Sequence, residues 1–204
     1  MGTAVHRIIE HQAASRPDAT AVAGDGRALT YREMNQRANT LARRLGESGL
    51  ARGSLALVRM PRCTDLAIVL LAVLKAGAAY AWIAPGSPGD LDLPASFSIA
   101  VARRGAEEQF LALDIVPALA AAASRPGPNL PVLTRGADLA CVLLDAGGLP
   151  HVLVPHATIA ALLPPAAGRS GTAGDAAGAL DLWLGLMSGA TMRLGATRPA
   201  TAAA

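Results

Sequence analysis

Hydrophobic and polar positions in the first half of the chain alternate between helical and strand patterns. The clearest helix is predicted over residues 31–45, where apolar side chains recur on one helical face at Met34, Ala38, Leu41, Ala42 and Leu45. Thr30 and Glu33 have the spacing of a capping box, which specifies where this helix begins. A helix over residues 5–14 precedes it, followed by strands over 20–23 and 27–30, which form a hairpin across Gly24-Asp25-Gly26.

An apolar helix flanked by two apolar strands follows. The strands are predicted over residues 54–60 and 80–84, and the helix over residues 65–76 ends at Gly77. Helices that alternate with apolar strands are typical of right-handed βαβ units. The sequence therefore predicts an α/β fold, with a partial doubly wound, mostly parallel sheet flanked by helices.

The second half of the chain is less regular. It predicts strands over residues 96–102, 139–144, 152–155 and 190–194, helices over 156–163 and 180–187, and an Ala-rich stretch over 118–124. Residues 164–178 consist largely of Ala, Gly, Pro, Ser and Thr, which predicts flexibility. We expect one domain over residues 1–195 and a disordered tail over 196–204.

Composition narrows the possible partners. The 204 residues are 52% hydrophobic but only 3% aromatic, so the core must consist of aliphatic side chains. The net charge of +3 comes from dispersed arginines and one lysine, Lys75, without the basic, aromatic stripe that nucleic-acid binding needs. We therefore expect no nucleic-acid partner.

The cysteines and the apolar runs indicate the compartment. Cys63 and Cys141 are far apart and outside any CxxC motif, which favours a reducing environment. Cys141 lies in an apolar strand, as an inert core thiol would. The longest apolar run, residues 66–74, is about half as long as a membrane span. Charges near the N-terminus are unlike a secretion signal, so we expect a cytoplasmic protein without membrane contact.

The four histidines fall in two pairs. His6 and His11 are five residues apart, as are His151 and His156. Residues at this spacing do not share a helical face, so we expect surface or loop histidines and no metal site.

Several segments resemble the adenylation domains of nonribosomal peptide synthetases. Residues 29–34 (LTYREM) and 74–80 (LKAGAAY) are similar to the first two core motifs of these domains, in the right order and at the right separation. Residues 5–22 resemble the lead-in of the same domains, and residues 180–195 resemble the region of the fourth motif. The resemblance implies the first part of an adenylation domain, truncated before the ribose-binding aspartate, most of the amino-acid pocket and the mobile C-terminal lobe.

The family's third motif departs most from the pattern. In the family, this Ser/Thr/Gly-rich loop ends in Pro-Lys-Gly and wraps the phosphates of ATP through backbone N–H groups, hydroxyls and a lysine. Here both flanks match, but the loop is about two residues short and lacks Ser and Thr. Its remaining positions include Asp145, Ala146, Gly147, Gly148 and His151.

Two of these replacements oppose phosphate binding. Asp145 stands where the family has a threonine, and His151 falls where the lysine belongs. A carboxylate 4 Å from a phosphate charge costs roughly 4 kcal/mol, and the lost lysine contact about 1.5–3 kcal/mol. We predict a degenerate phosphate loop, no bound cofactor and no catalytic residue.

One residue of the fourth motif could still bind substrate. Asp181 matches the aspartate that holds the substrate's amino group, but its spacing to Trp183 is shorter than in the family. We favour an ordinary aspartate at a helix start.

Three functions fit these observations. The leading hypothesis is an inactive adenylation-like domain that spaces or docks neighbouring condensation, oxidase or carrier domains, or a second copy of itself. The alternative is one half of a split amino-acid-adenylating enzyme, completed in trans by a partner. A third possibility is an inactive stand-alone module that regulates by occupying a docking surface.

Overall fold

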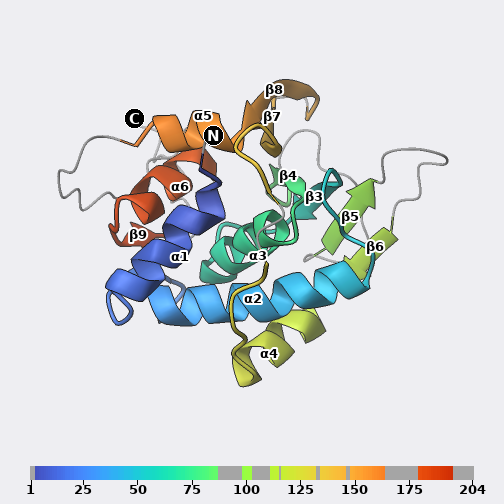
Figure 1. The fold of residues 1–204 in the computed structure, drawn as a ribbon. Coiled ribbons are helices and arrows are strands. Elements are labelled where there is room, and N and C mark those ends of the chain that lie inside the picture. Colours follow the sequence, from blue (N-terminus) through green and yellow to red (C-terminus); the bar gives the residue numbers. More distant parts are fainter. Residues whose placement is uncertain are drawn as a thin grey trace, which may run out of the picture.

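The computed structural model describes residues 3–86, 98–102, 111–114, 116–131, 134–145, 148–163 and 179–194. The helices in these residues are α1 (Val5–Ser15), α2 (Tyr31–Glu47), α3 (Thr64–Lys75), α4 (Val116–Ser124), α5 (His156–Ala161) and α6 (Ala179–Met187). The strands are β1 (Thr20–Gly24), β2 (Arg27–Thr30), β3 (Leu55–Arg59), β4 (Ala79–Ile83), β5 (Ser98–Ala102), β6 (Leu111–Asp114), β7 (Leu139–Leu144), β8 (Pro150–Pro155) and β9 (Met192–Arg193). Figure 1 shows their arrangement. The segment 164–178 and the tail 196–204 lie outside the described residues.

The larger sheet confirms the predicted α/β class and is mixed. Its six strands follow the order β6-β5-β3-β4-β7-β8. The predicted parallel pairing of β3 with β4 is present, and β4 also pairs parallel with β7. The pairs β3–β5, β5–β6 and β7–β8 are antiparallel, so the sheet is mixed and not mostly parallel as predicted. At the β8 edge the reason is connection length, because the few residues between β7 and β8 can join only antiparallel strands.

The smaller sheet confirms the predicted hairpin and adds a strand to it. β1 and β2 pair antiparallel across Asp25 and Gly26, which have φ angles of 52° and 71°. Two successive positive φ angles at an Asp-Gly pair are the signature of a type I′ hairpin turn. β9 pairs parallel with β1, which attaches the chain after α6 to the N-terminal hairpin.

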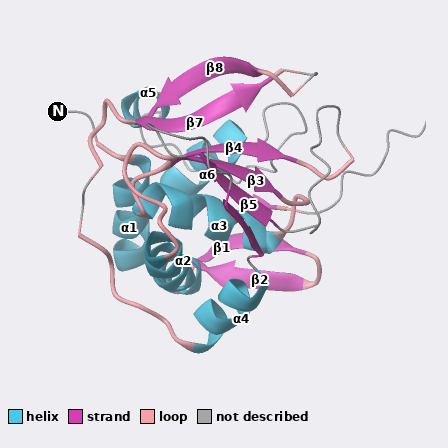
Figure 2. Cartoon of the chain, turned by 90° about the vertical axis from the view of Figure 1, so that its right-hand side faces the viewer, coloured by secondary structure: helices cyan, strands magenta, loops and turns pink. Residues whose placement is uncertain are grey.

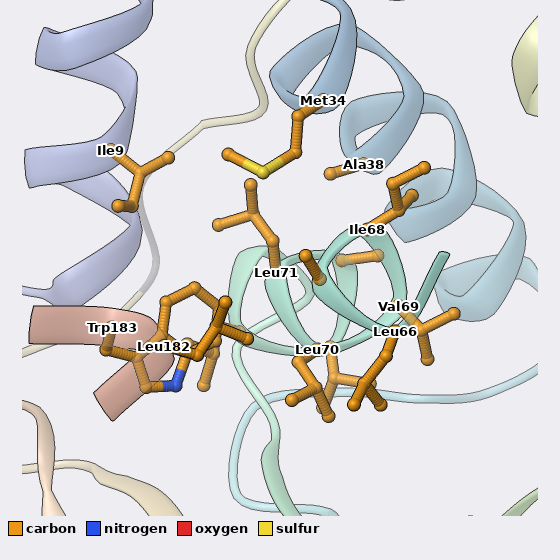
Figure 3. Packing of buried hydrophobic residues seen from close by; sticks show 14 of the residues in the cluster. Ile9, Met34, Ala38, Leu66, Ile68, Val69, Leu70, Leu71, Leu182 and Trp183 are labelled. Atoms are coloured by element: carbon orange, nitrogen blue, oxygen red, sulfur yellow. The ribbon is translucent and has the colours of Figure 1, made fainter. Parts of the chain in front are cut away.

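The centre of the molecule is α3, which is buried on all sides. Every residue from Leu66 to Leu74 is at most 2% exposed. Figure 2 shows α3 between the sheet strands β3 and β4 and the outer helices α1 and α2. Figure 3 shows side chains of α3 meeting Ile9 from α1, Met34 from α2 and Trp183 from α6. A helix that is apolar all round is stable only in such a setting, which explains its uniform sequence.

Helix α2 has the predicted start and also holds a distant loop. The Thr30 hydroxyl accepts from the Glu33 amide at 3.2 Å, and the Glu33 carboxylate accepts from the Thr30 amide at 2.9 Å, so the capping box is complete. The Ala-rich stretch forms α4, which packs against α2 as Figure 1 shows. The loop after α4 bonds to α2 through Thr40, Asn39 and Arg43.

Candidate functional site

The candidate phosphate loop connects β7 and β8. The start of β7 is fixed by Asp138, whose carboxylate accepts from the Arg52 guanidinium at 2.9 and 2.8 Å. This hydrogen bonding to Arg52 lowers the pKa of Asp138 below its usual value. Leu144 at the end of β7 pairs with Pro150 at the start of β8. The loop therefore spans only Asp145 to Leu149, of which Ala146 and Gly147 lie outside the described residues.

The described part of this loop is a turn closed by its own hydrogen bonds. The Asp145 amide donates to the Leu149 carbonyl at 2.9 Å, and the Gly148 amide donates to the Asp145 carbonyl at 3.0 Å. The Leu149 amide donates to the Asp145 carboxylate oxygen Oδ1 at 2.9 Å. Gly148 has a φ of 79°, a left-handed conformation that glycine adopts without strain.

This hydrogen bonding determines what the loop can bind. A phosphate cradle requires backbone N–H groups directed at the anion. Here the N–H groups of Gly148 and Leu149 are used within the turn, and the second of them faces a carboxylate. His151 is exposed on β8. The two sequence-predicted changes, Asp145 and His151, therefore lie on one hairpin, in which Asp145 closes the turn.

The fourth-motif region forms α6. Asp181 lies in the first turn of α6, as expected for an ordinary helix-start aspartate. Trp183 is fully buried, and its Nε1 donates to the Tyr80 hydroxyl of β4 at 2.6 Å. Burial raises the pKa of Tyr80 well above its ordinary value, which keeps this hydroxyl neutral. Trp183 thus serves the core, where it joins α6 to the large sheet.

Two of the four histidines contradict the prediction that all lie on the surface or in loops. His11 and His151 are exposed, but His6 and His156 are 3% and 0% exposed. The rings of His6 and His156 pack edge to face with centroids 5.9 Å apart. The sequence could not show this, because α1 and α5 meet only in the folded chain. Among the described residues, no group of three His, Cys, Asp or Glu side chains could hold a metal ion.

The cysteines have the properties of unreactive thiols. Cys141 is buried as predicted, and burial raises its pKa to about 11. Cys63 lies just before α3, and burial also raises its pKa. A nucleophilic cysteine needs the opposite shift, so neither thiol is suited to catalysis.

A buried ion pair was missed from the sequence. The Lys75 ammonium and the Glu10 carboxylate are in contact, and their side chains are 1% and 6% exposed. Burial lowers the pKa of Lys75, and the contact with Glu10 opposes that shift. The available signal was a single lysine at the end of an apolar helix. Lys75, part of the second family motif, thus holds α3 to α1.

A polar cavity of about 260 Å³ lies beside Glu10, between α1, α2 and the loop after α4. Its lining includes Asn35 and Asn39, whose side-chain amides both donate to Oδ1 of Asn129, at 2.9 and 3.0 Å. None of its lining residues comes from the β7–β8 turn. The cavity is therefore separate from the candidate phosphate loop.

Comparison with known proteins places the chain in a family. Residues 9–91 match the model of the AMP-binding enzyme family. The chain is 49% identical to surfactin synthase subunit 2 of Bacillus subtilis over 89 residues, which are 44% of this chain and 2% of that protein. It is 35% identical to one of the linear gramicidin synthase proteins of Brevibacillus parabrevis over 169 residues, 76% of this chain and 3% of that protein. The chain thus spans a small fraction of the length of these relatives.

Solved structures extend the match to nearly the whole chain. An artificially fused adenylation–PCP didomain, NpsA-ThdA from Klebsiella oxytoca, superimposes with a TM-score of 0.74 and 26% identity, over 96% of this chain and 40% of that chain. The N-terminal subdomain of NpsA in complex with anthranilyl-AMSN gives 0.74 and 25% identity, over 98% of this chain and 55% of that chain. Taken together, the matched motifs, the fold and these relatives show that the chain is the N-terminal part of an adenylation domain of the nonribosomal peptide synthetase type.

Proposed function

We propose that this chain is a catalytically inactive adenylation-like domain that serves as a structural or docking element in nonribosomal peptide biosynthesis. It binds no cofactor, and its place is the cytoplasm, which its two unpaired cysteines support. Within the described residues, no helix combines the length and apolarity that crossing a bilayer requires. The chemistry of peptide assembly then belongs to other domains.

The observation that carries the proposal is the closed turn at Asp145. Its carboxylate accepts the Leu149 amide at 2.9 Å, so an acidic group occupies the place where a phosphate cradle would need a donor. Binding a nucleotide there would require breaking this bond and placing phosphate charges near a carboxylate. At 4 Å such a like-charge pair costs roughly 4 kcal/mol, about a thousandfold in affinity.

A docking role is supported by large apolar side chains at the surface. Leu149 and Leu153 are each 66% exposed, and Val152 and Leu162 are 43% and 51% exposed. Leu149, Val152 and Leu153 belong to the turn and strand of the β7–β8 hairpin, and Leu162 follows α5. Large apolar side chains exposed on one hairpin and at the end of the helix that follows it are compatible with a contact site for another protein. The expected partners are neighbouring condensation, oxidase or carrier domains, or a second copy, with more than roughly 1,000 Å² buried.

Two assays test this function. Amino-acid-dependent exchange of pyrophosphate into ATP should stay at background with each of the twenty standard amino acids. A pull-down with the adjacent assembly-line domains should retain the chain, and an L149D/L153D variant should be retained less. Exchange above background would refute the inactive state. A monomeric chain that none of the adjacent domains retains would refute the docking role.

The second candidate is one half of a split amino-acid-adenylating enzyme completed in trans. The intact fold favours it, because a chain covering 40% of the NpsA-ThdA protein still superimposes on it with a TM-score of 0.74. The closed Asp145 turn argues against it. The split enzyme can be tested by mixing the chain with a polypeptide that carries the later part of an adenylation domain from the same assembly line. Exchange activity that appears only in the mixture would establish the split enzyme.

A further inference from the structure

The first residue of α1 is bound by a side chain far along the sequence. Ala4, at the N-cap position of α1, provides no side-chain hydrogen bond. Instead, the Val5 amide donates to Nδ1 of His156, the first residue of α5, at 3.2 Å. His156 therefore provides the acceptor that a Ser, Thr or Asp would normally supply at a helix start.

This hydrogen bond assigns the protonation state of His156. An imidazole nitrogen that accepts a hydrogen bond carries no proton, so the proton of neutral His156 is on Nε2. Nε2 of His156 is buried, and so is Nδ1 of His6, the ring packed against it. Neither nitrogen has a hydrogen-bond partner in the part of the chain that the structure describes. The two rings thus meet as neutral imidazoles in a site shielded from water.

The charges around the pair disfavour a second proton on either ring. Lys75 of α3 and Arg7 of α1 oppose a positive charge on His6, whereas Asp138 favours one on His156. The Glu10 carboxylate is already bonded to Lys75 and to Arg7. Burial is the largest effect, and the pKa falls to about 3 for His6 and to about 4 for His156. A cation on His156 would also face the positive end of the α1 dipole.

We propose that His156, Val5 and His6 form an acid-sensitive latch that holds α1 to α5, closed while both imidazoles are neutral and opened by protonation of either. Protonation at Nδ1 of His156 removes the acceptor of the Val5 amide and places a charge inside the contact. Few other apolar side chains hold the two helices in place, because α1 buries Val5, Ile9 and Ala13 and α5 buries Ile159, so such a change should separate α1 from α5.

The pH range follows from linkage. An exposed histidine takes up a proton as the pH falls through its ordinary pKa of 6.5, but the closed latch stays neutral down to about pH 4. The latch contributes its full stabilisation above pH 6.5 and loses it as the pH falls below that value. With two linked histidines, the equilibrium constant for opening should rise roughly several-hundredfold between pH 7 and pH 5. Most carboxylates remain ionised between pH 7 and pH 5, so the change over this range reports on the histidines.

Hydrogen exchange of the α1 amides, normalised for the intrinsic effect of pH, measures the opening. In the unmodified chain, we expect the protection of the α1 amides to fall roughly several-hundredfold between pH 7 and pH 5. At pH 5 it should be lower than the protection of the α3 amides. In H156N the side-chain oxygen can still accept from Val5 but does not titrate, so the fall should shrink to roughly 25-fold. H11N changes an exposed histidine on the same helix and should leave the fall unchanged.

Three results would overturn the latch. The first is a protection of the α1 amides that changes less than about threefold between pH 7 and pH 5. The second is equal protection of α1 and α3 at pH 5, and the third is an H11N variant that behaves like H156N.

If H156N does not fold, NMR of the imidazole groups in the unmodified chain provides a second test. We expect His156 as the Nε2–H tautomer, with the signals of His6 and His156 constant from pH 7 to pH 5. An Nδ1–H tautomer, or signals that titrate in this range, would contradict the proposal.

Discussion

Helix α3 and the β7–β8 hairpin are both apolar in sequence, but only the hairpin leaves large apolar side chains exposed. The residues from Leu66 to Leu74 are buried on all sides, whereas Leu149 and Leu153 on the hairpin are each 66% exposed. The two regions also differ in motif content, because α3 ends in the KAG sequence of the second motif and the hairpin contains the loop that we propose to be a degenerate phosphate loop. The core region thus lies within residues 9–91, which match the AMP-binding family, and the hairpin is where we propose that phosphate binding is lost.

Two residues of the regions that resemble family motifs have clear structural roles in the core. Lys75 belongs to a family motif, and in this chain it is buried and bonded to Glu10. Trp183 is likewise enclosed by the core and bonded to Tyr80. Both residues thus serve the core of this chain. On the hairpin, by contrast, the Leu149 side chain is 66% exposed.

Breaking the ion pair should have the largest effect on stability. Lys75→Met leaves the buried Glu10 carboxylate with only Arg7, so we expect the free energy of unfolding to fall by about 3–5 kcal/mol. The double variant E10Q/K75M should regain most of this loss. Denaturant unfolding measures both. The control is Arg7→Met, which removes the exposed partner of Glu10 and should cost at most about 1 kcal/mol. Equal losses for Lys75→Met and Arg7→Met would show that the burial of this pair has no energetic importance.

Replacing one leucine in each region by alanine tests whether α3 contributes more to stability than the exposed side of the β7–β8 hairpin. Leu70→Ala creates a cavity in a fully buried helix and should cost about 2–5 kcal/mol, whereas Leu153→Ala should stay within about 0.5 kcal/mol. Thermal unfolding of the two variants under identical conditions gives the difference. A Leu153→Ala variant as unstable as Leu70→Ala would mean that the hairpin is packed against something in solution.

The capping box should give a smaller effect. Thr30→Ala removes the acceptor of the Glu33 amide and should cost about 1 kcal/mol in unfolding free energy. Ser15→Ala is the control, because its exposed hydroxyl only donates to carbonyls near the end of α1 and should matter by less than about 0.5 kcal/mol. Equal effects of the two substitutions would contradict the role of the cap in specifying α2.

Sequence reasoning succeeded where neighbouring residues determine the structure. The cap and start of α2, the Asp-Gly hairpin and the β3–β4 pairing follow from local patterns, and all three are present. It failed for contacts between distant segments. The burial of His6 against His156 and the pairing of β1 with β9 depend on residues more than 140 positions apart. At the candidate site, the sequence identified Asp145 as a replaced residue, but its bond to the Leu149 amide required the fold.

Titration calorimetry with ATP and magnesium tests the central claim most directly. We expect no measurable binding up to roughly millimolar ATP, because the Asp145 carboxylate accepts the hydrogen bond of the Leu149 amide and repels phosphate. A dissociation constant in the micromolar range would contradict it, and would mean that the turn between β7 and β8 opens to receive the nucleotide.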